Sequence, residues 1–116
     1  EPEVMASEEE ASDYDLMDHG QVNARFCDDL LAFRPHPRRV LDVGTGTALI
    51  PVTLLERSPE TRAYAMDLSV PMIARALANV QRRGLSRRIA LLLADATGIP
   101  WEDDAFEVVM SNSIVH

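Results

Sequence analysis

The sequence is short of several residue types, and each shortage excludes a class of protein. It contains no lysine, so the lysine-dependent phosphate loop of nucleotide hydrolases is absent. Its one cysteine, Cys27, excludes an internal disulfide and a cysteine-cluster metal site, and a reducing cytoplasm is the expected compartment. No apolar run approaches the roughly 20 residues that cross a bilayer, and no secretory signal is recognisable. We therefore expect neither a membrane anchor nor a metal centre.

The negative charge is concentrated at the start of the chain. The formal net charge is −8, and residues 1–18 hold eight acidic residues and no basic one. The other 11 acidic residues balance the 11 arginines. We therefore predict an acidic, flexible segment over residues 1–18 and an α/β domain over residues 19–116. Because an acidic segment repels phosphates, we expect no direct binding to nucleic acid.

Helical and extended patterns alternate along the predicted domain. Apolar residues at helical spacing predict helices over residues 19–33, 47–57 and 70–83, and short apolar runs predict strands over 39–43, 62–66, 88–94 and 106–110. Ser69 and Gly84 are predicted to cap the two ends of the last helix. The run over 88–94 is almost entirely apolar, which predicts a strand buried on both faces. This alternation predicts a doubly wound α/β fold with a parallel sheet.

Candidate functional residues gather at the carboxyl ends of the predicted strands. Gly44 and Gly46 suit a tight turn after the first strand, where backbone N–H groups can approach a ligand closely. Asp42, Asp67 and Asp95 lie at or beside the ends of three strands. Because the carboxyl ends of parallel strands share one edge, we expect these carboxylates to converge on the turn. Carboxylates suit a ligand with hydroxyl, amino and cationic groups better than a ligand with phosphates.

Taken together, these segments resemble class I S-adenosylmethionine-dependent methyltransferases. Residues 40–47 are similar to that family's glycine motif, with Ala48 at the position of its third glycine. Residues 65–69 resemble its ribose-binding strand, residues 93–96 its adenine-binding segment, and residues 106–112 the strand beside its methyl-transfer pocket. The resemblance covers roughly residues 14–116 and implies a Rossmann-like sheet. It also implies S-adenosylmethionine as the cofactor and a small molecule as the methyl acceptor.

The resemblance further implies roles for single residues. It places Gly44, Thr45 and Gly46 beneath the methionine part of the cofactor. The other implied roles are Asp42 on the ammonium group, Asp67 on the ribose hydroxyls, Leu68 against the adenine, Asp95 on the adenine amine, the Ala96 N–H at a ring nitrogen, and Ser111 at the methyl-transfer pocket. Tyr14 and His19 are candidates for an N-terminal lid. No catalytic residue is assigned, because proximity and alignment can supply much of the catalysis of methyl transfer.

The family's fold has seven strands, and this chain stops just past the fourth. We therefore expect a fold truncated after that strand and incomplete relative to the family. The unpaired edge of the fourth strand favours self-association. Two alternatives remain open. One is a non-catalytic module that binds S-adenosylmethionine or a partner chain. The other is an NAD-dependent oxidoreductase, which is disfavoured because the G-x-G-x-x-G fingerprint has Leu49 at its third glycine position.

Overall fold

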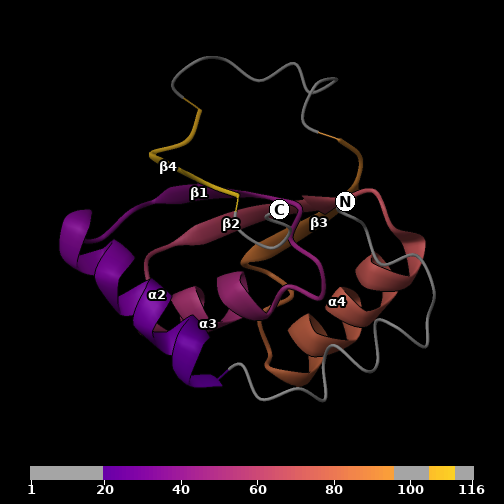
Figure 1. Ribbon diagram of the computed structural model, residues 1–116, viewed down its shortest axis with the longest axis horizontal. Helices are drawn as coiled ribbons and strands as arrows, with labels where there is room; N and C mark the ends of the chain where they lie inside the picture. Colours follow the sequence, from indigo (N-terminus) through magenta and orange to yellow (C-terminus); the bar gives the residue numbers. More distant parts are fainter. Residues whose placement is uncertain (1–19, 96–104, 112–116) are drawn as a thin grey trace.

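The computed structural model describes residues 20–95 and 105–111, which form one parallel sheet with helices against it (Figure 1). In chain order the elements are α2 (Gly20–Phe33), β1 (Arg39–Val43), α3 (Leu49–Arg57), β2 (Arg62–Asp67), α4 (Val70–Arg82), β3 (Ile89–Leu93) and β4 (Val108–Met110). The predicted acidic segment 1–18 lies outside the described residues, and so do Tyr14 and His19. The predicted order of helices and strands is confirmed, with half of the ends shifted by one or two residues.

The sheet has the strand order β3-β2-β1-β4, and every neighbouring pair is parallel. In the β1–β2 register Arg39 lies opposite Arg62 and Val43 lies opposite Met66. Asp67, the last residue of β2, lies opposite Leu93, the last residue of β3. The carboxyl ends of the central strands therefore meet at one edge, as predicted, and this edge is called the carboxyl edge below.

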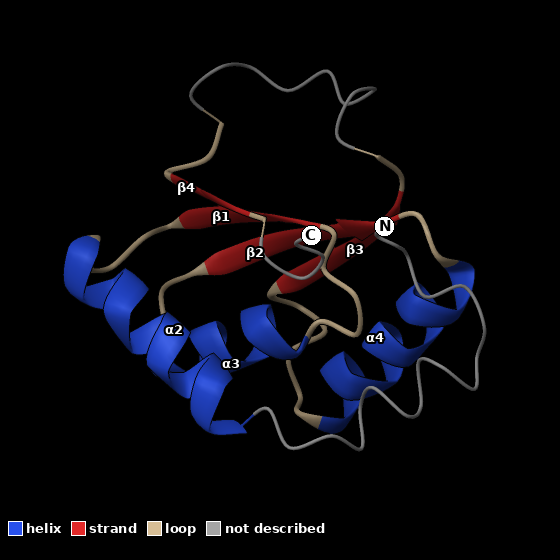
Figure 2. Ribbon diagram, in the orientation of Figure 1, coloured by secondary structure: helices blue, strands red, loops and turns tan. Residues whose placement is uncertain are grey.

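All three described helices pack on the same face of the sheet (Figure 2). The core lies between that face and the helices. It combines strand residues such as Val40 and Ala63 with helix residues such as Leu54, Ala76 and Val80, each at most 1% exposed. Cys27 of α2 is fully buried in the same core, as predicted, and burial raises the pKa of its thiol to about 12. The helices on this one face hold the strands in place, and so they also position the carboxyl edge.

The helix ends follow local sequence signals. Pro51 is the third residue of α3, where its missing N–H leaves no helical hydrogen bond unmade. Ser69 caps α4, because its side-chain oxygen accepts a hydrogen bond from the Met72 N–H at 3.3 Å. Gly84 follows α4 with a positive φ of 72°. Both predicted caps of α4 are confirmed. Among the described residues no helix is long and apolar enough to cross a membrane.

The prediction that the third strand is buried on both faces is wrong. β3 is an edge strand of the described sheet, and Leu93 is 55% exposed. A run of apolar residues indicates that the side chains favour burial, but it does not determine whether the strand lies in the centre or at the edge of the sheet. That position depends on which other strands pair with it. At the opposite edge, β4 pairs only with β1 in the described part of the chain, and Val109 is 62% exposed. The expected open edge is therefore present on β4.

Arg88, one residue before β3, joins three segments at the other end of the sheet. Its Nη2 donates to the carbonyl oxygens of Leu55 at 3.1 Å, Ser58 at 2.6 Å and Thr61 at 3.1 Å. These carbonyls belong to the end of α3 and to the loop that leads into β2. The last carbonyls of a helix have no partner within the helix, and a cation beside them also complements the helix dipole. Arg88 therefore stabilises the junction between α3, β2 and β3.

Candidate functional site

The glycine turn, defined as residues 44–48, leads from β1 to α3 at the carboxyl edge. Gly44 and Gly46 both have positive φ, at 71° and 62°, a conformation that glycine adopts without strain. A Cβ built on Gly46 would meet no atom within 4 Å. The requirement for glycine there is therefore set by the backbone angle. The turn is fixed to the neighbouring strand, because the Thr45 N–H donates to the Met66 carbonyl at 2.8 Å.

Asp67 holds the turn from the side of β2. Its Oδ2 accepts a hydrogen bond from the Gly46 N–H at 2.8 Å, and its Oδ1 accepts one from the Ser69 N–H at 2.9 Å. The side chain is buried, with 5% of its surface exposed. A carboxylate that accepts from two backbone N–H groups is strongly oriented. Asp67 therefore connects the glycine turn to the loop that begins α4.

Asp42 lies in β1 directly beneath the turn. The Thr45 hydroxyl donates to its Oδ2 at 2.7 Å, whereas its Oδ1 is buried and has no hydrogen-bond partner among the described residues. The pKa of Asp42 is raised to about 7, mainly because the group is buried; the Thr45 hydrogen bond lowers this pKa, and the charge of Asp67 contributes to raising it. A buried, unpaired carboxylate oxygen of this kind is suited to accept from a cationic donor.

One residue outside the predicted set, Asn79, also supports the turn. Asn79 of α4 is buried, and its Nδ2 donates to the Thr47 carbonyl at 2.9 Å. The Thr47 hydroxyl is buried and has no partner within the described residues. The sequence did carry a signal for Asn79. It lies on the apolar face of its helix, three residues after Ala76, where a polar side chain needs a buried partner.

Ala48, the residue at the third glycine position, has a φ of 69°. A left-handed backbone is unfavourable for alanine by roughly 1–2 kcal/mol. This cost explains why the family's motif has glycine at the position. Ala48 is fully buried, and its carbonyl accepts the Val52 N–H at 3.1 Å in the first turn of α3. The predicted helix start at residue 47 is therefore two residues early, because Thr47 and Ala48 belong to the turn.

The remaining predicted residues lie along the same edge. Leu68 follows Asp67 and is 58% exposed, so it offers an apolar surface to solvent beside the turn. Asp95 and Ser111 are exposed, just past the ends of β3 and β4. The Ala94 N–H donates to the Asp67 carbonyl at 3.0 Å, which holds the segment before Asp95 against β2. Ala96 lies outside the described residues.

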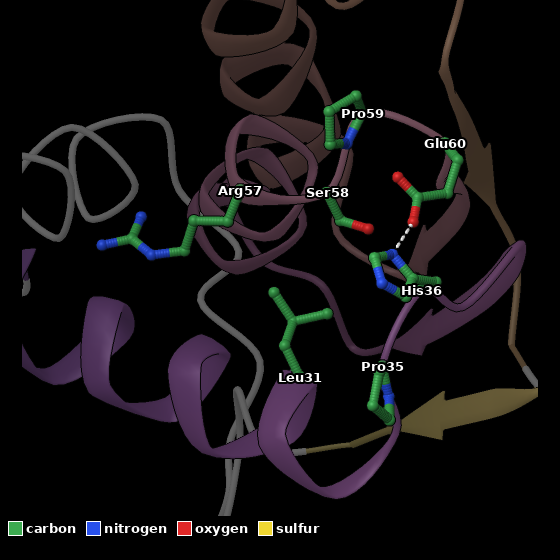
Figure 3. Close-up of a pocket in the computed structure, with 7 residues that line it drawn as sticks. All are labelled: Leu31, Pro35, His36, Arg57, Ser58, Pro59 and Glu60. Atoms are coloured by element: carbon green, nitrogen blue, oxygen red, sulfur yellow. Dashed lines mark hydrogen bonds and ion pairs between the residues drawn. The ribbon is translucent and has the colours of Figure 1, made fainter.

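A pocket of about 230 Å³ opens at the opposite, amino end of the sheet (Figure 3). Figure 3 shows His36 and Glu60 beside each other on one side of it, and the two side chains are hydrogen-bonded. A backbone N–H hydrogen bond and the His36 ring together lower the pKa of Glu60. This pocket contains none of the predicted ligand-binding residues. Within the described ranges, no three His, Cys, Asp or Glu side chains are grouped so as to hold a metal ion.

Comparison with known proteins identifies the family. The sequence profile of a family described as "Methyltransferase domain" matches residues 40–116, which include the glycine turn and the three aspartates. The chain belongs to this methyltransferase domain family. The family predicted from the sequence motifs is therefore confirmed.

Similar proteins include the malonyl-[acyl-carrier protein] O-methyltransferase of Halorhodospira halophila, which is 40% identical over 93 residues. That match covers 79% of this chain and 30% of the relative. The demethylmenaquinone methyltransferase of Thermus thermophilus is 39% identical over 79 residues, with 68% and 35% covered. The chain thus spans about a third of the length of these curated relatives.

Solved structures confirm the fold. A putative S-adenosyl-L-methionine-dependent methyltransferase from Methanococcus maripaludis superposes with a TM-score of 0.83 at 22% identity, covering 92% of this chain and 50% of that one. A methyltransferase from Geobacter sulfurreducens, in complex with S-adenosyl-L-homocysteine, gives a TM-score of 0.68 at 23% identity, covering 81% and 36%. The predicted parallel, Rossmann-like α/β architecture is therefore correct.

Proposed function

We propose that this chain is the cofactor-binding part of an S-adenosylmethionine-dependent methyltransferase that acts on a small-molecule acceptor in the cytoplasm. The observation that carries the proposal is the buried, unpaired Oδ1 of Asp42 beneath the glycine turn. A cationic ammonium is the type of group that would satisfy it. When bound, the cofactor supplies an electrophilic methyl group on a sulfonium.

The chain's own residues bind and orient this cofactor. Asp42 accepts from the ammonium, and the backbone of Gly44, Thr45 and Gly46 supports the methionine part. Asp67 keeps acceptor capacity for ribose hydroxyls, because each carboxylate oxygen accepts one backbone N–H and has a second lone pair. The remaining assignments concern the base and the methyl end: Leu68 against the adenine, Asp95 on its amine, Ala96 through its N–H, and Ser111 beside the methyl-transfer pocket.

The acceptor is inferred from relatives of which this chain spans about a third of the length. The similar proteins include an O-methyltransferase for a malonyl group on acyl-carrier protein and a C-methyltransferase for quinone biosynthesis. A transfer assay therefore begins with a malonyl thioester and a demethylated quinone as acceptors. The alternative function is a non-catalytic module that binds the cofactor or a partner chain, and it predicts cofactor binding without transfer to any acceptor.

Isothermal titration with S-adenosylhomocysteine tests the cofactor site. We expect saturable binding by the chain, and loss of binding in Asp67→Ala. Asp29→Ala, an exposed position on α2, serves as the control and should bind normally. Saturable binding of NAD in preference to S-adenosylhomocysteine would support the oxidoreductase alternative. The absence of binding by the whole, folded protein would overturn the proposal.

A further inference from the structure

A second pocket, of about 200 Å³, lies between β2 and β3 where these strands begin. It is lined by Arg62, Ala63 and Tyr64 from β2 and by residues 86–90 from the turn before β3 and from β3 itself. Arg62 and Asp67 are the first and last residues of β2, so roughly 17 Å of strand separates this pocket from the carboxyl edge. The pocket is therefore spatially separate from the glycine turn.

The pocket is positively charged. Arg62 and Arg87 are exposed, and neither forms an ion pair with a carboxylate in the described part of the chain. Arg62 donates from Nη1 to the Arg87 carbonyl at 3.1 Å, which fixes its guanidinium at the pocket wall and leaves its other donors available. Arg88, also in the lining, donates to backbone carbonyls at the end of α3 and in the loop before β2, so its guanidinium is already engaged within the fold.

Three other arginines of the domain pair with carboxylates. Arg57 pairs with Asp28 at 2.8 Å, and Arg34 lies 3.8 Å from Glu107. Arg83 likewise pairs with Glu56 at 2.5 Å. Arg88 also interacts electrostatically with Glu60, whose carboxylate is hydrogen-bonded to His36. Arg62 and Arg87 therefore bring two guanidinium groups to one pocket, and neither has a carboxylate partner among the described residues.

We propose that this pocket binds the phosphate monoester group of a small molecule. Planar guanidinium groups recognise phosphate through paired, charge-assisted hydrogen bonds. Two such groups match the double negative charge of a phosphate monoester better than they match the single negative charge of a carboxylate. The lining also offers Ser86 as a hydroxyl donor and Ala90 beside the Tyr64 ring as a less polar wall. The volume suits a phosphate with a few carbon atoms.

Amide-resolved NMR titration of the protein with glycerol 3-phosphate tests the proposal, with acetate at equal ionic strength as the comparison. We expect saturable shifts at the amides of Ser86, Arg87 and Arg88, and none at Gly46 or Ser69. Affinity should fall about tenfold or more in Arg62→Gln and in Arg87→Gln, since each removes a charged hydrogen bond to the ligand. Arg25→Gln, an exposed arginine on α2, is the matched control and should bind normally.

Several outcomes would overturn the proposal. One is an equal response to acetate and to glycerol 3-phosphate, which would indicate general ionic effects. Another is unchanged affinity in Arg87→Gln, whose side chain makes no hydrogen bond within the described structure and can be replaced without loss of folding. Tighter binding of a DNA oligonucleotide, with shifts spread over many arginines, would indicate that the positive charge serves to bind a macromolecule and not a small phosphate ester. Titration with S-adenosylhomocysteine reports separately on the carboxyl edge.

Discussion

Asp67 accepts a hydrogen bond from the backbone N–H of Gly46, 2.8 Å away, and so joins the end of β2 to the turn that follows β1. The same carboxylate accepts the Ser69 N–H through its other oxygen. The residue expected to contact the ribose is thus also the residue that holds the turn in shape. Loss of Asp67 should consequently affect stability as well as cofactor binding.

The substitution Asp67→Asn tests this double role. An asparagine amide can accept one backbone N–H, but its NH₂ then points at the other backbone donor. We expect the free energy of unfolding in urea to fall by about 1–3 kcal/mol, together with weaker binding of S-adenosylhomocysteine. Asp29→Asn on α2 is the control. Weaker binding with unchanged stability would show that the turn keeps its shape without Asp67.

The pKa of Asp42 predicts how stability depends on pH. In the folded protein this pKa is about 7, compared with about 4 for an unperturbed aspartate. Between these values the folded state holds a proton that the unfolded chain releases. The contribution of Asp42 to stability therefore falls as pH rises from about 4 to about 7, and is constant above. Subtracting the urea-unfolding profile of Asp42→Asn should isolate this slope, and parallel profiles would refute the assignment.

Binding of the cofactor should show the opposite dependence on pH. A cationic group at the unpaired Oδ1 favours the ionised form of Asp42, so binding releases a proton below pH 7. We expect the affinity for S-adenosylhomocysteine to decrease as pH falls from 8 to 6. Titration in two buffers of different ionisation enthalpy measures the released proton directly. Proton release that persists in Asp42→Asn would place the titrating group elsewhere.

The left-handed backbone of Ala48 predicts contrasting effects for two substitutions. Ala48→Gly relieves the backbone strain but removes a buried methyl group, so we expect a change in stability of about 1 kcal/mol or less. Ala48→Val adds a β-branched side chain at the same φ and should destabilise by more than 2 kcal/mol on an order-of-magnitude estimate. Thermal and urea unfolding measure both. Equal stability of the valine variant and the original protein would contradict the observed φ.

The open edge of β4 predicts self-association of the 116-residue chain. Val109→Lys should shift the sedimentation profile toward the monomer, because a charged side chain opposes pairing at an exposed edge. Val70→Lys is a matched control, since Val70 and Val109 are both 62% exposed but Val70 lies at the start of α4. A monomer at all concentrations, or an equal effect of the two substitutions, would count against this edge.

The sequence predicted the elements and the edge where ligand-binding residues gather, because short apolar runs and the Gly44–Gly46 spacing are local signals. It did not predict the exposure of Leu93, since the place of β3 in the sheet depends on contacts between distant segments. The double hydrogen bond of Asp67 was missed for a similar reason. Its partners come from two different loops.

At Ala48 the glycine motif is a better guide to the backbone conformation than the helix propensity of alanine. The predicted helix begins at Thr47, one residue before Ala48, although alanine itself favours helices. The family's glycine motif has a glycine at this position, and in the structure Ala48 has a positive φ there. Reading the departure from the motif as a statement about backbone angle would have given the correct helix start at Leu49.

The bonds of Arg88 change how the edge of the sheet is expected to open. Edge strands commonly fray, since only one side of their backbone is paired. Here, separation of β3 from β2 would also remove the guanidinium from the carbonyls of Leu55, Ser58 and Thr61. The end of α3 and the start of β3 therefore form one cooperative unit. Hydrogen exchange of their amides should proceed through a shared opening event, even though the two segments are some 30 residues apart in the chain.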